Sequence, residues 1–116
     1  METSDERKQR RIEHGRRVRA ARTVAGLTLS GLALELGVEK STAARWDAGE
    51  LTMGPQYVEA LVQRHALGTE IRNWIVFGGK VPERVAAAFK EVCAEAERRE
   101  RLKPRRKRAA NGEARR

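Results

Sequence analysis

The sequence predicts an all-α protein: a compact five-helix unit, one more helix and a tail. Apolar residues recur at intervals of three and four in several stretches, which places them on one face of a helix. Glycines separate these stretches, and 116 residues suffice for one small core with an extension. We expect the five-helix unit over 1–77, the C-terminal helix within 78–102, and a disordered basic tail over 103–116, which cannot bury enough apolar area to fold.

The first helix is expected over 7–24, after a loose N-terminal segment. Its apolar positions follow helical spacing only weakly, and its first half is too polar to be buried. Basic side chains surround it on several faces. Among them we expect Arg16 and Arg17 to reach phosphates that flank a nucleic-acid site.

Two short helical patterns separated by one glycine stand between Thr28 and Gly49. The first pattern is an apolar stripe made of Leu29, Leu32, Ala33 and Leu36. Ala33 is small, as required where two short helices cross closely. Gly37 can adopt a positive φ, which ends the first helix and reverses the chain. This pattern is typical of a helix-turn-helix, whose second helix enters the major groove of DNA.

The second helix of this pair, expected over 40–48, has an inward and an outward face. Ala43 and Trp46 lie three residues apart and point inward. The outward face is small, polar and basic, and consists of Lys40, Ser41, Ala44 and Arg45.

Each outward residue has a chemistry suited to base edges. Lys40 and Arg45 can donate to guanine O6 and N7, and the guanidinium of Arg45 suits a bidentate contact. Ser41 can bond to a base edge or a phosphate, and Ala44 can touch a thymine methyl group. Glu39 either accepts from cytosine or caps the helix.

With these residues in view, the segment 15–67 resembles the phage Cro and repressor family, also called xenobiotic-response-element-type helix-turn-helix proteins. The resemblance implies a lambda-repressor-like fold and sequence-specific binding of double-stranded DNA. It also implies that Arg22, late in the first helix, pairs with Asp47 near the end of the reading helix and orients it. The residues that would form the framework of this unit are Arg22, Leu32, Ala33, Gly37, Ala43, Trp46 and Asp47.

The resemblance also suggests where the DNA backbone would be held. By analogy with the family, Thr28, Thr42 and Thr52 are candidate phosphate contacts. The chain departs from the family pattern at Leu29, where a phosphate-holding glutamine is usual, and at Met53, where a proline is usual.

Three further helices are expected after this unit, and the one over 69–77 carries more large apolar side chains than so short a helix needs for its own packing. A fourth helix is expected over 56–65, a fifth over 69–77 and the last over 83–101. The fifth either closes the core or contributes to a dimer interface, and the last either docks on the domain or pairs with its copy. The candidate dimer residues are Trp74, Phe77, Val85, Phe89 and Val92.

The charge is concentrated at the two ends of the chain. The net charge is +9, and residues 1–26 carry eight Lys or Arg against four Asp or Glu. Residues 98–116 carry ten against two, whereas residues 27–97 carry seven against ten. A polyanion is the natural partner for such ends, and a basic tail adds salt-sensitive affinity for nucleic acid. Membrane binding is not expected.

No constellation in the sequence supports catalysis or a cofactor. The single cysteine, Cys93, cannot form an intramolecular disulfide, and His14 and His65 lack partners at metal-ligand spacing. We therefore expect no enzyme activity, metal or cofactor, and we expect a nucleoid-associated protein in the cytoplasm of a bacterium or a phage-infected cell.

Three functions remain open on the sequence alone. The favoured one is a homodimeric transcriptional regulator, by default a repressor, on an inverted-repeat operator. The alternative is an antitoxin or adaptor that holds a protein partner through Leu34, Trp74 and the helix over 83–101. RNA binding is less favoured because aromatic stacking residues are scarce.

Overall fold

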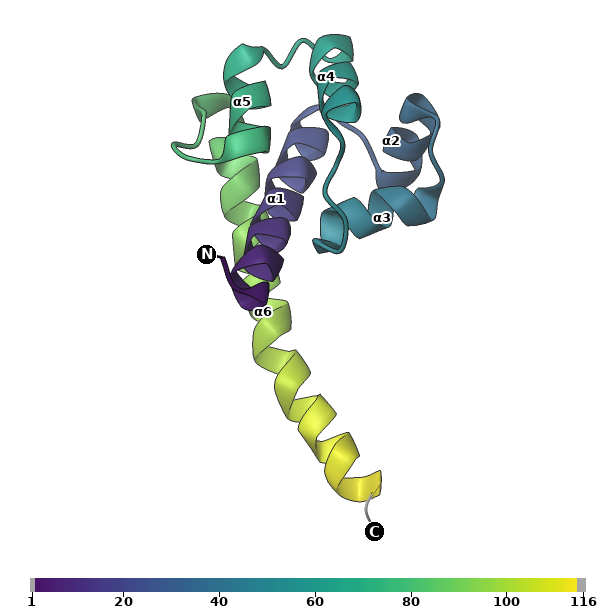
Figure 1. Ribbon diagram of the computed structural model, residues 1–116, viewed down its shortest axis with the longest axis vertical. Coiled ribbons are helices and arrows are strands. Elements are labelled where there is room, and N and C mark those ends of the chain that lie inside the picture. Colours follow the sequence, from purple (N-terminus) through teal and green to yellow (C-terminus); the bar gives the residue numbers. More distant parts are fainter. Residues whose placement is uncertain (1, 115–116) are drawn as a thin grey trace.

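The computed structural model describes the backbone of residues 2–114 and the side chains of residues 2–102. Within that part of the chain there are six helices and no strand, so the all-helical prediction is confirmed. The helices are α1 (Ser4–Val24), α2 (Leu29–Leu36), α3 (Lys40–Ala48), α4 (Pro55–Arg64), α5 (Thr69–Phe77) and α6 (Glu83–Ala114). In Figure 1, α1 runs through the middle of the domain, with α2, α3 and α4 on one side and α5 on the other.

Helix α1 begins earlier than the sequence patterns predicted. The hydroxyl of Thr3 accepts from the backbone N–H of Glu6 at 3.1 Å, and the carboxylate of Glu6 accepts from the backbone N–H of Thr3 at 2.8 Å. This reciprocal capping box satisfies two backbone donors at the start of the helix. The segment expected to be loose is therefore ordered by its own cap.

The core is a single cluster to which all six helices contribute. Its largest fully buried side chains are Trp46, Leu32, Leu61, Ile75, Val18, Val58 and Val85. Helix α1 contacts α3, α5 and α6, so it connects the α2–α3 pair to the C-terminal helices.

The first turns of α6 pack along α1, and this packing decides where the expected dimer residues lie. Val85 and Val92 are buried within the chain, and Phe89 is half-buried. The ring of Phe89 meets that of Trp74 edge to face at 5.1 Å between centroids. Trp74 is buried too, so these four residues close the core, and only Phe77, 81% exposed, is open to a partner.

The backbone of α6 continues to Ala114, beyond the expected end near residue 101 and into the segment expected to be a disordered tail. Arg, Lys and Ala in residues 103–114 have high intrinsic helix propensity, whereas Pro104 and Gly112 oppose a helix. The lack of apolar area in this segment had predicted a disordered tail instead. The side chains of 103–116, and the predicted contacts of the basic tail, lie outside the described residues.

Candidate nucleic-acid interface

A tight joint connects α2 to α3. Thr28 caps the start of α2, where its hydroxyl accepts from the backbone N–H of Gly31 at 3.0 Å. At the other end, Gly37 has φ of 71° and the N–H of Val38 donates to the carbonyl of Ala33 at 3.0 Å. A left-handed glycine with this backward hydrogen bond ends a helix within one residue. The chain therefore turns directly from α2 into α3.

The inner faces of α2 and α3 are packed as their spacing predicted. Leu32 and Ala33 of α2 are buried, as are Ala43 and Trp46 of α3. The indole of Trp46 also lies 5.2 Å from the ring of Tyr57 in α4, measured between centroids. These contacts fix which side of α3 faces away from the protein.

The opposite side of α3 is accessible. Lys40, Ser41 and Arg45 are exposed, and Ala44 between them is half-buried. Arg45 Nε lies 3.7 Å from Glu50 Oε1, with side-chain exposures of 56% and 65%. An ion pair this exposed is weak, so the guanidinium of Arg45 remains available to another partner. The face that the sequence assigned to base reading is thus an open surface.

Three other predicted contacts surround this face. Glu39 is exposed and occupies the N-cap position of α3, but its side chain makes no capping hydrogen bond. Thr28 remains exposed while it caps α2, and Thr42 is half-buried in α3. Thr52 is exposed in the segment between α3 and α4.

An ion pair fastens α3 to α1. Arg22 Nη2 lies 2.6 Å from Asp47 Oδ2, and Arg22 Nε donates to Asp47 Oδ1 at 3.4 Å. Arg22 also donates to the carbonyl of Leu27 at 3.0 Å, and Arg19 Nε lies 3.9 Å from Asp47 Oδ2. The pair that the resemblance implied is present, and it joins the inner side of α3 to the end of α1.

The backbones of α1 and the end of α3 touch at two glycines. A Cβ atom on Gly15 would lie 2.6 Å from the carbonyl oxygen of Trp46. One on Gly49 would lie 2.6 Å from Cα of Ile12, and Gly49 also has φ of 77°. Any larger residue at either position would force α1 and α3 apart. Sequence reasoning missed this contact because nothing local distinguishes a packing glycine in a polar helix.

A buried histidine holds the segment that follows α3. His14 Nδ1 lies 3.1 Å from the carbonyl oxygen of Ile75, and the N–H of Met53 donates to His14 Nε2 at 3.2 Å. The ring is therefore neutral, with its proton on Nδ1, since Nε2 must accept. Burial, together with the positive charge of Arg17, lowers the pKa of His14. The partners are 39 and 61 residues away, so no spacing in the sequence could reveal them.

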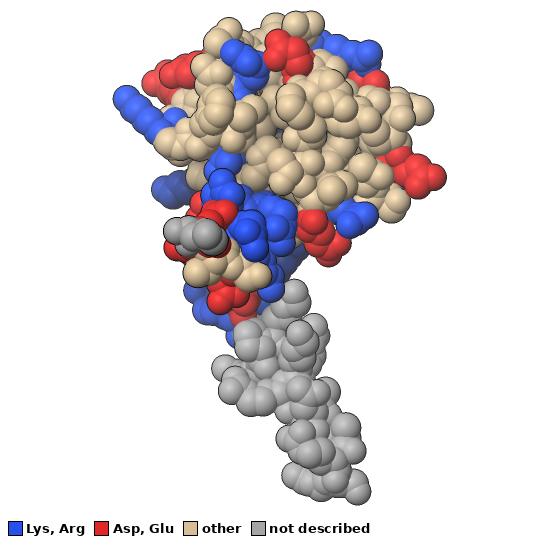
Figure 2. All heavy atoms as spheres, viewed as in Figure 1, with Lys and Arg blue, Asp and Glu red and all other residues tan. Residues whose placement is uncertain are grey.

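The two arginines of α1 expected to hold phosphates are both partly buried. Arg17 is half-buried and its Nε donates to the carbonyl of Ile75 at 3.1 Å. Arg16 is also half-buried, and its Nε has no hydrogen-bond partner in the described part of the chain. Figure 2 shows Lys and Arg gathered over the N-terminal part of α1, next to a largely uncharged face.

No family model, curated protein or solved structure matches this chain. The interpretation of α2 and α3 therefore rests on their own geometry. Among the described residues, no three His, Cys, Asp or Glu side chains gather into a potential metal site. None of the described helices combines the length and hydropathy needed to span a bilayer.

Proposed function

We propose that this protein is a sequence-specific regulator of transcription that binds double-stranded DNA with α2 and α3 as a lambda-repressor-like helix-turn-helix. One observation carries the proposal: Lys40, Ser41 and Arg45 form an exposed row on a short helix whose opposite side is buried. A helix anchored on one side and polar on the other suits the major groove. The close glycine joint to α2 supports the same arrangement.

The proposed base contacts follow from the donors on this row. Arg45 makes a bidentate contact to guanine O6 and N7, and Lys40 donates to the same edge of a second guanine. Ser41 bonds to a base edge, Ala44 meets a thymine methyl group, and Glu39 accepts from cytosine N4. Each good bidentate contact discriminates against a wrong base by about 1–3 kcal/mol.

The proposed operator is an inverted repeat bound by a homodimer. Two copies related by a two-fold axis would read half-sites about 34 Å apart, one turn of the duplex. Phe77 is the exposed aromatic available for such a dimer. Occupation of a promoter would exclude polymerase, so repression in a bacterial or phage-infected cell is the proposed outcome.

Selection from randomised duplexes tests this proposal. The expected result is enrichment of one motif with two inverted half-sites, their centres about 10 base pairs apart. Failure to enrich any motif would contradict the proposal. In a separate competition assay, displacement of every bound duplex by single-stranded RNA would also contradict it.

A second candidate function, a protein-interaction module such as an antitoxin or adaptor, is favoured by two exposed apolar side chains. Leu34 in α2 is 85% exposed, and Phe77 is nearly as accessible. Trp74 no longer supports this alternative because it is buried against Phe89. Single exposed apolar residues are common on soluble surfaces, so DNA binding is the stronger proposal. Co-purification of a stoichiometric protein partner would favour the alternative.

A further inference from the structure

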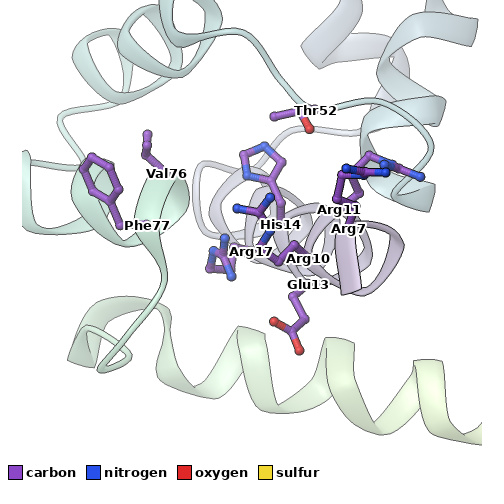
Figure 3. Close-up of a pocket in the computed structure, with 9 residues that line it drawn as sticks. All are labelled: Arg7, Arg10, Arg11, Glu13, His14, Arg17, Thr52, Val76 and Phe77. Atoms are coloured by element: carbon purple, nitrogen blue, oxygen red, sulfur yellow. The ribbon is translucent and has the colours of Figure 1, made fainter. Parts of the chain in front are cut away.

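A cavity of 440 Å³ opens between the N-terminal half of α1, the segment that joins α3 to α4, and the end of α5. Figure 3 views α1 nearly end-on, with Thr52 on one side of the cavity and Val76 and Phe77 on another. Four of the lining residues are arginines, namely Arg7, Arg10, Arg11 and Arg17.

Helical spacing explains why these arginines gather. Positions 7, 10, 11, 14 and 17 follow intervals of three and four and so share one face of α1. Like charges at these intervals repel one another and destabilise a helix unless they are neutralised. The face is therefore a concentrated positive surface.

Little in the described part of the chain neutralises it. Only Arg10 of the four forms an ion pair there, with Glu2 at 2.6 Å, and the Arg10 side chain remains mostly exposed. Arg11 Nε is buried and has no hydrogen-bond partner among the described residues. Glu13 is the one carboxylate in the lining, and in Figure 3 it points toward α6, away from Thr52. The positive charge on this face is therefore only partly offset by carboxylates in the described part of the chain.

We propose that this cavity binds a phosphate group. Guanidinium groups present several N–H donors in a plane that matches phosphate oxygens, and several arginines together offset a double negative charge. The exposed hydroxyl of Thr52 adds a neutral donor from the opposite wall. The volume is within the range of small-molecule sites. The phosphate is supplied either by the backbone of a nucleic acid or by a small phosphorylated molecule.

The position of the cavity links its occupant to α3. Thr52 precedes Met53, whose N–H is held by His14 from the cavity wall. A phosphate bonded to Thr52 and the arginines would therefore brace the segment that directly follows α3. This inference does not rest on DNA binding, because free phosphate compounds test it without DNA.

Calorimetric titration with pyrophosphate, at constant ionic strength set by chloride, tests the proposal. The wild-type chain is compared with Arg7→Gln/Arg11→Gln and with a control, Arg98→Gln/Arg101→Gln, which removes two exposed arginines of α6. We expect pyrophosphate to bind the wild type and the control alike. The cavity variant should bind it at least tenfold more weakly, with a melting temperature no lower than that of the wild type, because the substitutions relieve repulsion between like charges on α1. Thr52→Val should weaken binding severalfold without altering net charge.

Absence of pyrophosphate binding to the wild type, or an equal loss in both double variants, would overturn the proposal. Titrations of duplex DNA over a range of salt then identify the source of the phosphate. If the phosphate belongs to the DNA backbone, the negative slope of log K against log salt becomes shallower by about 0.9 for each lost contact. The slope should then be shallower for the cavity variant than for the control. If it is a small molecule, the cavity variant loses pyrophosphate while its duplex binding matches that of the control.

Discussion

Arg22 holds both carboxylate oxygens of Asp47, at 2.6 Å from Nη2 and 3.4 Å from Nε, and both side chains are nearly buried, at 13% and 10% exposure. Removal of one partner from such a pair leaves a buried charge uncompensated. We expect Asp47→Ala to lower the free energy of unfolding by about 3 kcal/mol in urea denaturation. Glu50→Ala, which removes an exposed pair with Arg45, should change it by less than about 0.5 kcal/mol. Similar effects of the two variants would contradict this role for Asp47.

The contact between α1 and α3 at Gly15 gives a prediction of unusual sign. In an exposed helix, Gly→Ala stabilises by up to about 1 kcal/mol. At Gly15 the added Cβ would lie 2.6 Å from the Trp46 carbonyl oxygen, so Gly15→Ala should destabilise by about 1–3 kcal/mol. Gly26→Ala is the comparison, since Gly26 has open space around it and a φ of 78°. It should cost only the backbone strain of about 1 kcal/mol. A gain in melting temperature for Gly15→Ala would show that α1 and α3 can separate freely.

His14 should make stability depend on pH. Its folded-state pKa is lowered from 6.5, chiefly by burial, so the unfolded chain binds more protons as the pH falls below that value. The contribution of His14 is complete above about pH 7 and is lost as the pH falls through 6.5 toward the lowered pKa. His14→Gln keeps a donor and an acceptor but does not titrate. Its free energy of unfolding should therefore fall less than that of the wild type between about pH 7.5 and about pH 5.5. If stability falls equally with pH in the two proteins, His14 is not held neutral between Ile75 and Met53.

The basic tail is predicted to supply affinity without specificity. Deletion of residues 103–116 removes seven Lys or Arg against one Glu. We expect the shortened chain to bind all duplexes more weakly at low salt and with a shallower salt dependence, while its preference for a selected operator over scrambled DNA persists. If the shortened chain no longer prefers the operator, the tail contributes to sequence recognition and this prediction is wrong.

Local patterns were sufficient for the α2–α3 unit and for several helix ends. The bounds of α3 and α5 match the expected ones, and Gly37, Ala43 and Trp46 take the roles that their spacing indicated. These features depend on residues within a few positions of one another, where helical periodicity and glycine conformation act directly.

Features that depend on distant residues were not predictable in the same way. The hydrogen bonds of His14 join α1 to the end of α5 and to the segment after α3. The arginine cavity exists only because α1 passes that same segment. The sequence left open whether Trp74 closes the core or meets a partner, since an aromatic residue suits both. Only the packing of Phe89 against Trp74 decides it.

Competition binding with Arg45→Ala measures whether the exposed side of α3 reads DNA. Labelled operator from the selection experiment is displaced by unlabelled operator or by a scrambled duplex, for the wild type, for Arg45→Ala and for Arg98→Ala as a control of equal charge change. We expect the ratio of operator affinity to scrambled-duplex affinity to fall by about tenfold or more for Arg45→Ala and to stay unchanged for the control. Salt-dependent binding to scrambled DNA should be retained. If Arg45→Ala discriminates as well as the wild type, the exposed side of α3 does not read DNA.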